Sequence, residues 1–493
     1  MNILLITSDQ QRPDAIGCVN PTLQTPNLDQ LAKEGILFER AYTVNPVCTP
    51  SRCSILTGQY PSRHGCFHVG TSLPENYGPT VADNLSQAGY FTALLGKAHF
   101  QACKDPKSFE SAPHVHNLDF FKKWSGPYFG FQHAQLVIGH TSEPHASGMN
   151  YGVWLSNQGI DLTSYFNIHD YDHFGPWHLP EHYHGSTWIA NESIAAIDRA
   201  ADQNQPFFIW ASFQDPHNPY VTPEPWASMY NAEDMPNPIS QSHKMEDKPP
   251  FYRTLQNGQF YGDDPDLQDR GWGDCKIRPE RTTQDIKRLR AVYNGMVSLM
   301  DFHIGRLLSH LEMRGLLNET LIVFTSDHGD YLGDHQLWGK GLPTYECMQR
   351  VPFIVRHPHC TTRGARSYAL QSLVDLEKTF LNIAQCKPGK NSQGICQIES
   401  WMRANHQARD WALVEFRPSH GPFMQHTYIE GRYKLVQYKN RAYGELYDLF
   451  KDPHQCHNLY EHADFKNVRE AMTSRFHAHN FKEECIRERM AVA

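Results

Sequence analysis

The chain has 493 residues, more than a single hydrophobic core usually serves, so we expect one large domain and a smaller one. Hydrophobic residues make up 40% of the sequence and charged residues 20%, as in ordinary globular proteins, and no run approaches the roughly 20 apolar residues that span a bilayer. The formal net charge of -8 provides no general attraction for nucleic acid or anionic lipid, so an anionic substrate requires a local cluster of cations.

The predicted elements begin at the N-terminus, where the apolar residues 3–7 lead to Asp9. This start lacks the basic residues, the long apolar stretch and the cleavage site of a signal peptide, so the sequence as written indicates a cytoplasmic protein. A trimmed N-terminus would look the same and would leave a periplasmic or secreted protein open. The 12 cysteines form no regular framework and no paired Cys-x-x-Cys sets, which disfavours a disulfide scaffold and a structural zinc site.

Short apolar runs that end in polar residues predict four buried strands, at residues 3–7, 92–95, 207–212 and 321–325. Because apolarity in these runs is continuous, we expect strands covered on both faces, as in a parallel α/β sheet. Helical patterns lie between them, at residues 25–35, 81–89, 184–201 and 288–315. In the first of these helices Thr25 is a candidate cap, Pro26 stands in the first turn and Gly35 ends the helix.

Two segments, near 105–180 and 229–274, are rich in Gly, Pro, His and aromatic residues without sustained periodicity. We interpret them as insertions over one rim of the domain, where substrate specificity is usually determined. Beyond them, the sequence predicts a hairpin over 426–438, a strand over 445–449 and a helix over 468–480. We therefore divide the chain into a catalytic domain, 1–400, and a C-terminal α+β subdomain, 401–493, with an antiparallel sheet and a helix.

The most specific motif is Cys48-Thr49-Pro50-Ser51-Arg52, which resembles the Cys-x-Pro-x-Arg motif of the sulfatases. The resemblance implies an alkaline-phosphatase-like α/β/α sandwich and oxidation of Cys48 to formylglycine by a formylglycine-generating enzyme. The hydrated aldehyde would attack sulfur with one oxygen and expel sulfate with the help of the other. A short motif alone carries false positives, so the assignment depends on the further matches along the chain.

A divalent metal site is predicted from two pairs of residues that follow predicted strands: Asp9 with Gln10, and Asp327 with His328. Oxygen-rich ligation favours calcium, with manganese or magnesium as alternatives, and the Cys48 derivative is a further ligand. Sulfatases more often have Asp and Asn at the second and fourth of these positions. Gln10 and His328 instead resemble the phosphonate monoester hydrolase and choline sulfatase branches, and the imidazole makes manganese more plausible.

Three cations are expected to bind the anion. Gly96-Lys97-Ala98-His99 resembles the family's Gly-Lys-x-His motif, and Leu337-Trp338-Gly339-Lys340-Gly341 resembles the segment with its second lysine, so Lys97 and Lys340 would face the sulfate oxygens. The third, Arg52, can hold the alkoxide of the nucleophile and the metal ligands. By resemblance, His217 of Pro216-His217-Asn218-Pro219 donates a proton to the leaving alcohol, and His99 deprotonates the remaining hydroxyl. Imidazoles beside an anion site suit both tasks at neutral pH.

We expect hydrolysis of an O-sulfate ester, preferably on a carbohydrate, since the Trp, Tyr and His residues of the insertions could stack on sugar rings. The substrate would be a sulfated small molecule or oligosaccharide, with no nucleic-acid partner, and the oligomeric state is left open. Two alternatives remain: a phosphonate monoester or phosphodiester hydrolase on the same scaffold, and an inactive sulfoglycan-binding protein if Cys48 is not converted.

Overall fold

The architecture is built around a large mixed sheet. The computed structural model describes residues 1–139, 142–239, 245–252, 265–267, 276–278, 280–389, 391–418, 422–479, 481 and 487–490. Within this part of the chain the main sheet has eight strands in the order β13-β2-β12-β10-β1-β7-β4-β5. Their bounds are β1 (Asn2–Ser8), β2 (Ile36–Phe38), β4 (Phe91–Lys97), β5 (His133–Val137), β7 (Phe207–Ser212), β10 (Thr320–Ser326), β12 (Phe353–Arg356) and β13 (Ala365–Ser367).

The four predicted strands are β1, β4, β7 and β10, and they lie next to one another in the centre of this sheet. All three pairings between them are parallel, so their carboxyl ends meet at one edge. The prediction of a parallel α/β sheet is therefore confirmed. Strand β12 is antiparallel to both of its neighbours, a feature that the sequence did not indicate.

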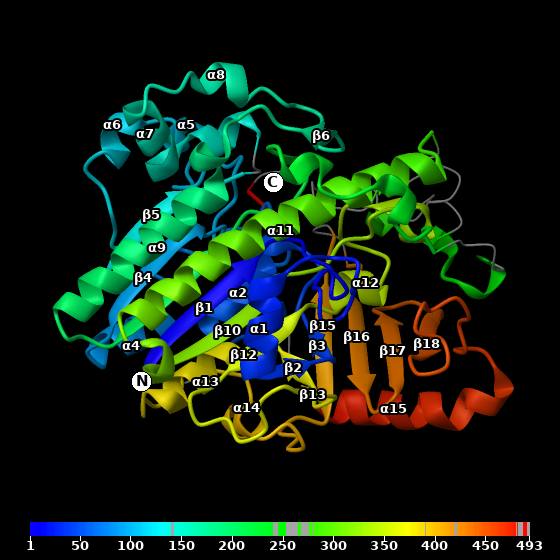
Figure 1. The fold of residues 1–493 in the computed structure, drawn as a ribbon. Helices are drawn as coiled ribbons and strands as arrows, with labels where there is room; N and C mark the ends of the chain where they lie inside the picture. Colours follow the sequence, from blue (N-terminus) through cyan, green and yellow to red (C-terminus); the bar gives the residue numbers. More distant parts are fainter. Residues whose placement is uncertain are drawn as a thin grey trace.

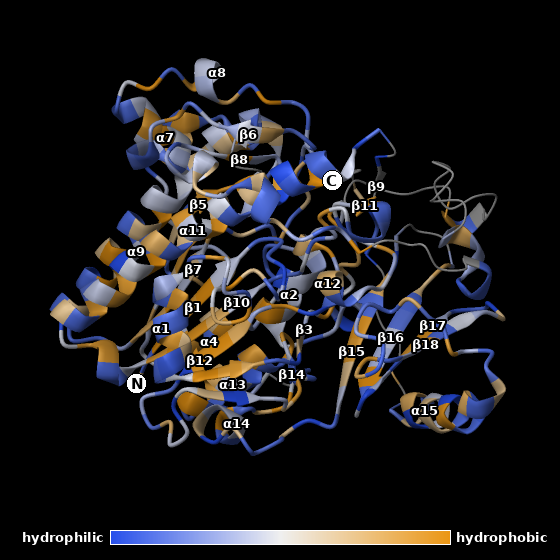
Figure 2. Cartoon of the chain, turned by 45° about the vertical axis from the view of Figure 1, so that its right-hand side comes forward, coloured by the Kyte–Doolittle hydropathy of each residue, from blue (hydrophilic) through white to orange (hydrophobic). Residues whose placement is uncertain are grey.

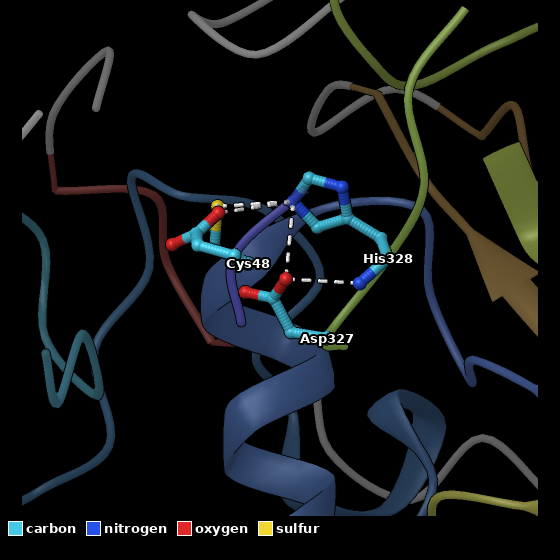
Figure 3. Close-up of side chains that lie close together, drawn as sticks. Cys48, Asp327 and His328 are labelled. Carbon is cyan, nitrogen blue, oxygen red and sulfur yellow. Dashed lines mark hydrogen bonds and ion pairs between the residues drawn. The ribbon is translucent and has the colours of Figure 1, made fainter. Parts of the chain in front are cut away.

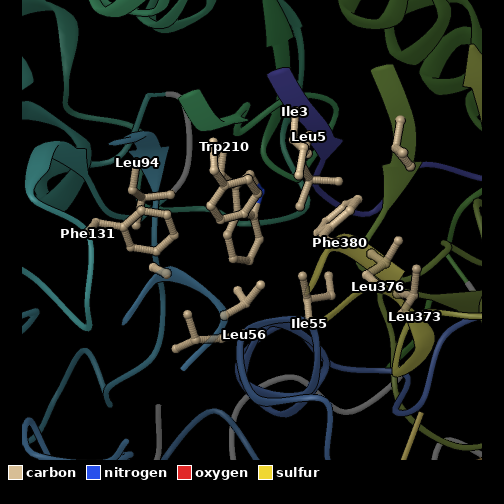
Figure 4. Packing of buried hydrophobic residues seen from close by; sticks show 14 of the residues in the cluster. Ile3, Leu5, Ile55, Leu56, Leu94, Phe131, Trp210, Leu373, Leu376 and Phe380 are labelled. Carbon is tan, nitrogen blue, oxygen red and sulfur yellow. The ribbon is translucent and has the colours of Figure 1, made fainter. Parts of the chain in front are cut away.

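Helices cover both faces of the sheet because successive side chains of a strand point to opposite faces. Ile3 and Leu5 pack into one apolar cluster, and Leu4 and Ile6 pack into another on the other face (Figure 4 shows the first). Figures 1 and 2 show the resulting layers, with hydrophobic residues concentrated on the central strands. The covering helices are α2 (Cys48–Thr57), α4 (Val81–Gln87) and α13 (Asp375–Ile383) on one side, and α1 (Pro26–Glu34), α9 (Gly185–Asp202) and α11 (Thr283–Met313) on the other.

Helix α11 begins five residues before the predicted start at 288. The Thr282 hydroxyl accepts a hydrogen bond from the Asp285 N–H, and the Asp285 carboxylate accepts one from the Thr282 N–H. This capping box is a sequence signal for a helix start, so the boundary was predictable. Although α11 has 31 residues, no helix in the described part of the chain is both long and apolar enough to cross a bilayer.

The segment near 105–180 contains more regular structure than its composition indicates. Its elements are α5 (Ala112–Val115), α6 (Leu118–Phe121), β5, α7 (Met149–Asn157), α8 (Leu162–Tyr165) and β6 (Phe174–Pro176). Strand β5 pairs with β4 and so belongs to the main sheet. Most of the second segment, 229–274, lies outside the described residues; 229–239, 245–252 and 265–267 are described.

A four-stranded antiparallel sheet with a helix on one face forms the C-terminal part, as predicted (Figure 1). Its elements are β15 (Trp411–Phe416), β16 (Gln425–Glu430), β17 (Tyr433–Tyr438), β18 (Gly444–Asp448) and α15 (Lys466–Ala478). Met472 and Phe476 of α15 pack on Tyr428 and Leu435 of the sheet. Strand β15 was not predicted. Two short elements of the large domain, β3 (Ala41–Tyr42) and α12 (Glu346–Gln349), lie beside this sheet.

Candidate active site

The ends of β1 and β10 bring two carboxylates together. Ser8 pairs with Ser326 in the parallel register, so Asp9 and Asp327 leave the sheet side by side, and both are fully buried. The N–H groups of Gln10 and His328 donate hydrogen bonds to Asp327 Oδ1 at 3.1 and 2.9 Å. The two pairs of residues expected from the sequence therefore lie together at one edge of the sheet.

Cys48 is the first residue of α2 and points into this group (Figure 3). Its Sγ lies 3.2 Å from His328 Nε2 and 3.7 Å from Asp9 Oδ1. Ligand atoms of Asp9, Cys48, Asp327 and His328 all lie within 4.8 Å of one another. His328 Nδ1 lies 2.8 Å from the Gly329 carbonyl oxygen, which can only accept, so Nδ1 carries a proton and Nε2 is the nitrogen that faces Cys48.

Arg52 follows Cys48 by one turn of α2 and connects the strand ends. Its Nε donates to Asp327 Oδ2 at 2.8 Å and its Nη2 donates to Asp9 Oδ2 at 3.2 Å. Its Nη1 donates to the Lys97 carbonyl oxygen at 2.9 Å and to Ser212 Oγ at 2.7 Å. The guanidinium is fully buried, so both its charge and its planar geometry hold the site in place.

Two lysines lie beside this arrangement. Lys97, the last residue of β4, has its Nζ 2.5 Å from Asp9 Oδ2. Lys340 Nζ lies 2.9 Å from Cys48 Sγ and 2.7 Å from His217 Nε2. Burial by itself would raise the pKa of Asp9, but Lys97 and the other nearby cations hold that pKa well below its ordinary value. Asp9 is therefore a carboxylate at neutral pH.

The two candidate histidines are placed differently. His217 Nδ1 lies 2.7 Å from the Asn218 carbonyl oxygen, so Nδ1 carries a proton and Nε2 is the nitrogen that faces Lys340. His99 instead has its Nε2 3.3 Å from Cys103 Sγ, while its Nδ1 is buried without a hydrogen-bond partner. Burial and then the charge of Lys97 lower the pKa of His99 well below its ordinary value. His99 is thus a neutral imidazole.

The residues present fit a divalent cation. Gln10 donates from Nε2 to Asp330 Oδ2 at 2.6 Å, while its Oε1 is buried without a hydrogen-bond partner. An unpartnered buried oxygen is costly unless something else binds it. With this amide oxygen, two carboxylates, the Nε2 of His328 and the atom carried by Cys48, the site offers a largely oxygen-based ligand set.

Sequence reasoning missed two supporting residues. Ser212 is the last residue of β7 and donates from Oγ to the Lys97 carbonyl oxygen at 2.7 Å. Its position at a strand end was a signal that could have found it. Asp330 accepts from Gln10 and from the Tyr220 hydroxyl at 2.8 Å, and no sequence pattern distinguishes it from other loop carboxylates.

Known proteins with similar sequences and folds cover nearly the whole chain. The Sulfatase family model matches residues 1–386, and the model for the N-sulphoglucosamine sulphohydrolase C-terminal region matches residues 333–482. An arylsulfatase of Clostridium perfringens is 31% identical over 480 residues, covering 94% of this chain and 91% of that protein. An N-acetylglucosamine-6-O-sulfatase of Bacteroides thetaiotaomicron is 26% identical over 521 residues, covering 96% of this chain and 85% of that protein.

The solved structure of a phosphonate monoester hydrolase from Silicibacter pomeroyi has the same fold. It aligns with a TM-score of 0.78 and 24% identity over 98% of this chain and 96% of that chain. The expected alkaline-phosphatase-like architecture is thereby confirmed. Because the family model spans the whole region that supplies Asp9, Cys48, Asp327 and His328, the chain belongs to the sulfatase family and is a sulfuric ester hydrolase.

Proposed function

We propose that this sulfatase hydrolyses an O-sulfate ester of a carbohydrate with a nucleophile formed from Cys48 by oxidation to formylglycine. The observation that carries the proposal is the position of Cys48 Sγ, 2.9 Å from Lys340 Nζ and within the group formed by Asp9, Asp327 and His328. In the converted protein, the hydrated aldehyde would place its oxygens where Sγ now stands. The formylglycine-generating enzyme would be the partner that carries out this oxidation.

The cations around Cys48 are suited to a sulfate group. Lys97 and Lys340 would neutralise the sulfate oxygens, while Arg52 holds the carboxylates of Asp9 and Asp327 in place. Such fixed charges in a buried site stabilise developing negative charge without reorganising at the moment of reaction. This arrangement favours attack at an anionic ester over attack at a neutral one.

Proton transfers would involve the two histidines. One hydroxyl of the hydrate loses its proton to solvent and forms a bond to sulfur while the bond between sulfur and the ester oxygen breaks. The departing oxygen takes a proton from Nε2 of His217, which acts in this step as the imidazolium, protonated on both ring nitrogens. The second hydroxyl then loses its proton to His99, the bond between carbon and the sulfated oxygen breaks, and sulfate leaves as the aldehyde re-forms. Support for His217 is its position: its Nε2 lies 2.7 Å from Lys340 Nζ, which is itself 2.9 Å from Cys48 Sγ. Support for His99 is that its ring is neutral and so has a nitrogen that can accept a proton.

A divalent cation would be held by Asp9, Gln10, Asp327 and His328 together with the group derived from Cys48. When bound, such an ion supplies positive charge that lowers the pKa of an adjacent hydroxyl. Calcium is the preferred ion because oxygen donors dominate, and manganese or magnesium remain alternatives.

The carbohydrate substrate is supported by the name of the Bacteroides relative, an N-acetylglucosamine-6-O-sulfatase. A phosphonate monoester or phosphodiester hydrolase is the second candidate, favoured by the Gln10 and His328 pair and compatible with the fold of the Silicibacter enzyme. A third, an inactive sulfoglycan-binding protein, applies if Cys48 stays a thiol.

The test combines mass spectrometry of the peptide containing Cys48 with assays on an aryl sulfate, sulfated sugars and a matched phosphodiester. We expect a mass loss of about 18 Da, the difference between thiol and aldehyde, and loss of sulfate release in Cys48→Ala. Cys360→Ala, at another buried thiol, is the matched control and should remain active. An unmodified cysteine in fully active protein would contradict the proposal, and preference for the phosphodiester would select the second candidate.

A further inference from the structure

A cavity of about 570 Å³ lies where the large domain meets the C-terminal sheet. We call it the seam cavity. Its wall includes residues 39, 40 and 42 at β3, residues 345–347 and 350 at α12, and residues 449, 450, 453 and 454 after β18. Its described lining contains none of the candidate catalytic or metal-binding residues, so it is separate from the site around Cys48.

Every carboxylate in the wall of the seam cavity already has a cation of its own. The pairs are Arg12 with Asp14 and Asp334, Arg290 with Asp334, Arg366 with Glu39, and Lys434 with Glu346. Two of these cations, Arg366 and Lys434, come from outside the described lining. Each carboxylate therefore has an ion-pair partner other than the two remaining arginines of the wall, Arg40 and Arg350. Burial alone would raise the pKa of Glu346, and at longer range the charge of Arg350 adds to that of Lys434 in lowering it.

Those two arginines, Arg40 and Arg350, form no ion pair with a carboxylate of the described chain. Arg40 Nη2 and Arg350 Nε are shielded from solvent and have no hydrogen-bond partner among the residues that the structure describes. The Nη1 of Arg350 donates only a long bond, 3.5 Å, to the Glu39 carbonyl oxygen. Partial burial of a guanidinium that lacks an ion-pair partner and has unused N–H donors costs free energy. A bound oxyanion would balance its charge and accept hydrogen bonds from its N–H groups.

Two aromatic rings also line the seam cavity and are unusually exposed. Tyr368 is 66% exposed and Phe450 is 64% exposed. The Phe450 ring centre lies 6.0 Å from the guanidinium carbon of Arg40 and 5.7 Å from that of Arg432, which is paired with Asp448, so an aromatic ring and two guanidinium groups lie side by side. Exposed flat rings of this kind are typical of a binding surface, and the C–H face of a sugar ring can stack on them.

We propose that the seam cavity is a second binding site, outside the catalytic centre, for a sulfated sugar unit. Arg40 and Arg350 hold the sulfate group, and Phe450 and Tyr368 contact the sugar ring. The geometry alone indicates a ligand that carries an anionic group on a ring. The choice of a sulfated sugar as that ligand rests on the function proposed above. A polymeric substrate would then be held at one unit while another unit enters the catalytic centre.

The test uses the full chain with Cys48→Ala, which cannot turn over sulfate esters, and calorimetric titration with a sulfated disaccharide. We expect two binding events, one of which weakens by roughly tenfold or more in the Arg40→Gln, Arg350→Gln variant, because two charge-assisted contacts are lost. The matched control is Arg403→Gln, an exposed arginine elsewhere, which should leave both events unchanged. The unsulfated disaccharide should not bind at the seam cavity.

Three results would overturn the inference: one binding event in the parent, unchanged binding in the double arginine variant, or equal affinity for inorganic sulfate and the sulfated disaccharide. The last result would leave an anion site without sugar recognition. If the arginine variant does not fold, Phe450→Ala with Tyr368→Ala changes only exposed rings and should weaken the disaccharide but not inorganic sulfate. Because binding is measured without hydrolysis, failure of the proposed activity would show separately, as no turnover by the protein with Cys48 intact.

Discussion

Replacing Arg52 by lysine keeps one positive charge on α2 but removes the planar group that connects the strand ends. The guanidinium donates to both Asp327 and Asp9, while also donating to the Lys97 carbonyl oxygen and to Ser212. A lysine has three hydrogens on a single nitrogen and cannot reach both carboxylates in this geometry. Asp9 would keep Lys97, whereas Asp327 Oδ2 would lose the donor described for it.

The size of the effect follows from these contacts. Hydrogen bonds to charged groups contribute roughly 1.5–3 kcal/mol each, and Arg52→Lys loses about two of them. We therefore expect a cost of about 3–6 kcal/mol at the site. If this cost falls on the transition state, kcat/KM for an aryl sulfate drops by roughly 10²–10⁴-fold, since each 1.36 kcal/mol is about a factor of ten.

The assay is hydrolysis of an aryl sulfate, expressed per molecule whose position 48 is converted, because Arg52 belongs to the motif around that residue. Thermal unfolding is measured in parallel to separate activity from stability. Arg403→Lys, which affects an exposed pair with Glu399, is the control and should change either quantity little. A converted Arg52→Lys protein with activity within about threefold of the parent would refute the reasoning about the fork geometry.

Burial raises the pKa of Glu110 to about 7 from 4.5, so Glu110 stabilises the fold most below about pH 4.5 and that contribution is lost as the pH rises to about 7. In the parent protein this carboxyl lowers the unfolding free energy by about 3 kcal/mol between about pH 4 and pH 8, and the Glu110→Gln variant should lack that decrease. Urea titrations that show the same decrease in both proteins would contradict the prediction. Arg409→Met should cost roughly 3–5 kcal/mol because it leaves the buried Asp375, bonded at 2.8 and 2.9 Å, without its cation. Adding Asp375→Asn should recover part of that loss in denaturant unfolding; a larger loss in the double variant would contradict the explanation. Removal of the metal by a chelator should lower the melting temperature. Adding the ion back to 100 times its Kd should restore about 2.7 kcal/mol of unfolding free energy. The Gln10→Ala variant should require more calcium for the same increase in stability. Equal calcium dependence in the Gln10→Ala protein would exclude its amide oxygen as a ligand.

Local patterns in the sequence were enough to predict the centre of the fold. Continuous apolar runs identified β1, β4, β7 and β10, because a strand that is buried on both faces has apolar side chains on both faces and does not alternate between apolar and polar residues. The parallel arrangement then implied that residues after these strands converge, as Asp9 and Asp327 do. The C-terminal hairpin was also evident, since its turn and strands are consecutive in the chain.

Edge strands were less accessible to sequence reasoning. Strand β5 has a mixed burial pattern within an aromatic-rich segment, and β15 reaches its partner β16 only after an intervening loop. Their identity as strands depends on the neighbour that each finds in the folded chain. The preference of a residue for a strand depends largely on how its side chain packs against the neighbouring strand. The sequence of one segment therefore contains little information about whether that segment forms an edge strand.

The sequence by itself determined which residue types stand at the strand ends, and therefore the chemistry that the site can offer. Tertiary structure alone decided which atoms meet: that Arg52 divides its donors between Asp9 and Asp327, that Nε2 of His328 faces Cys48, and that His99 turns to Cys103. It also decided that Arg40 and Arg350 form no ion pair with a carboxylate in the part of the chain that the structure describes. Most of these contacts join residues far apart in the chain, and their geometry depends on how β1, β10, α2 and α12 pack, which no local pattern encodes.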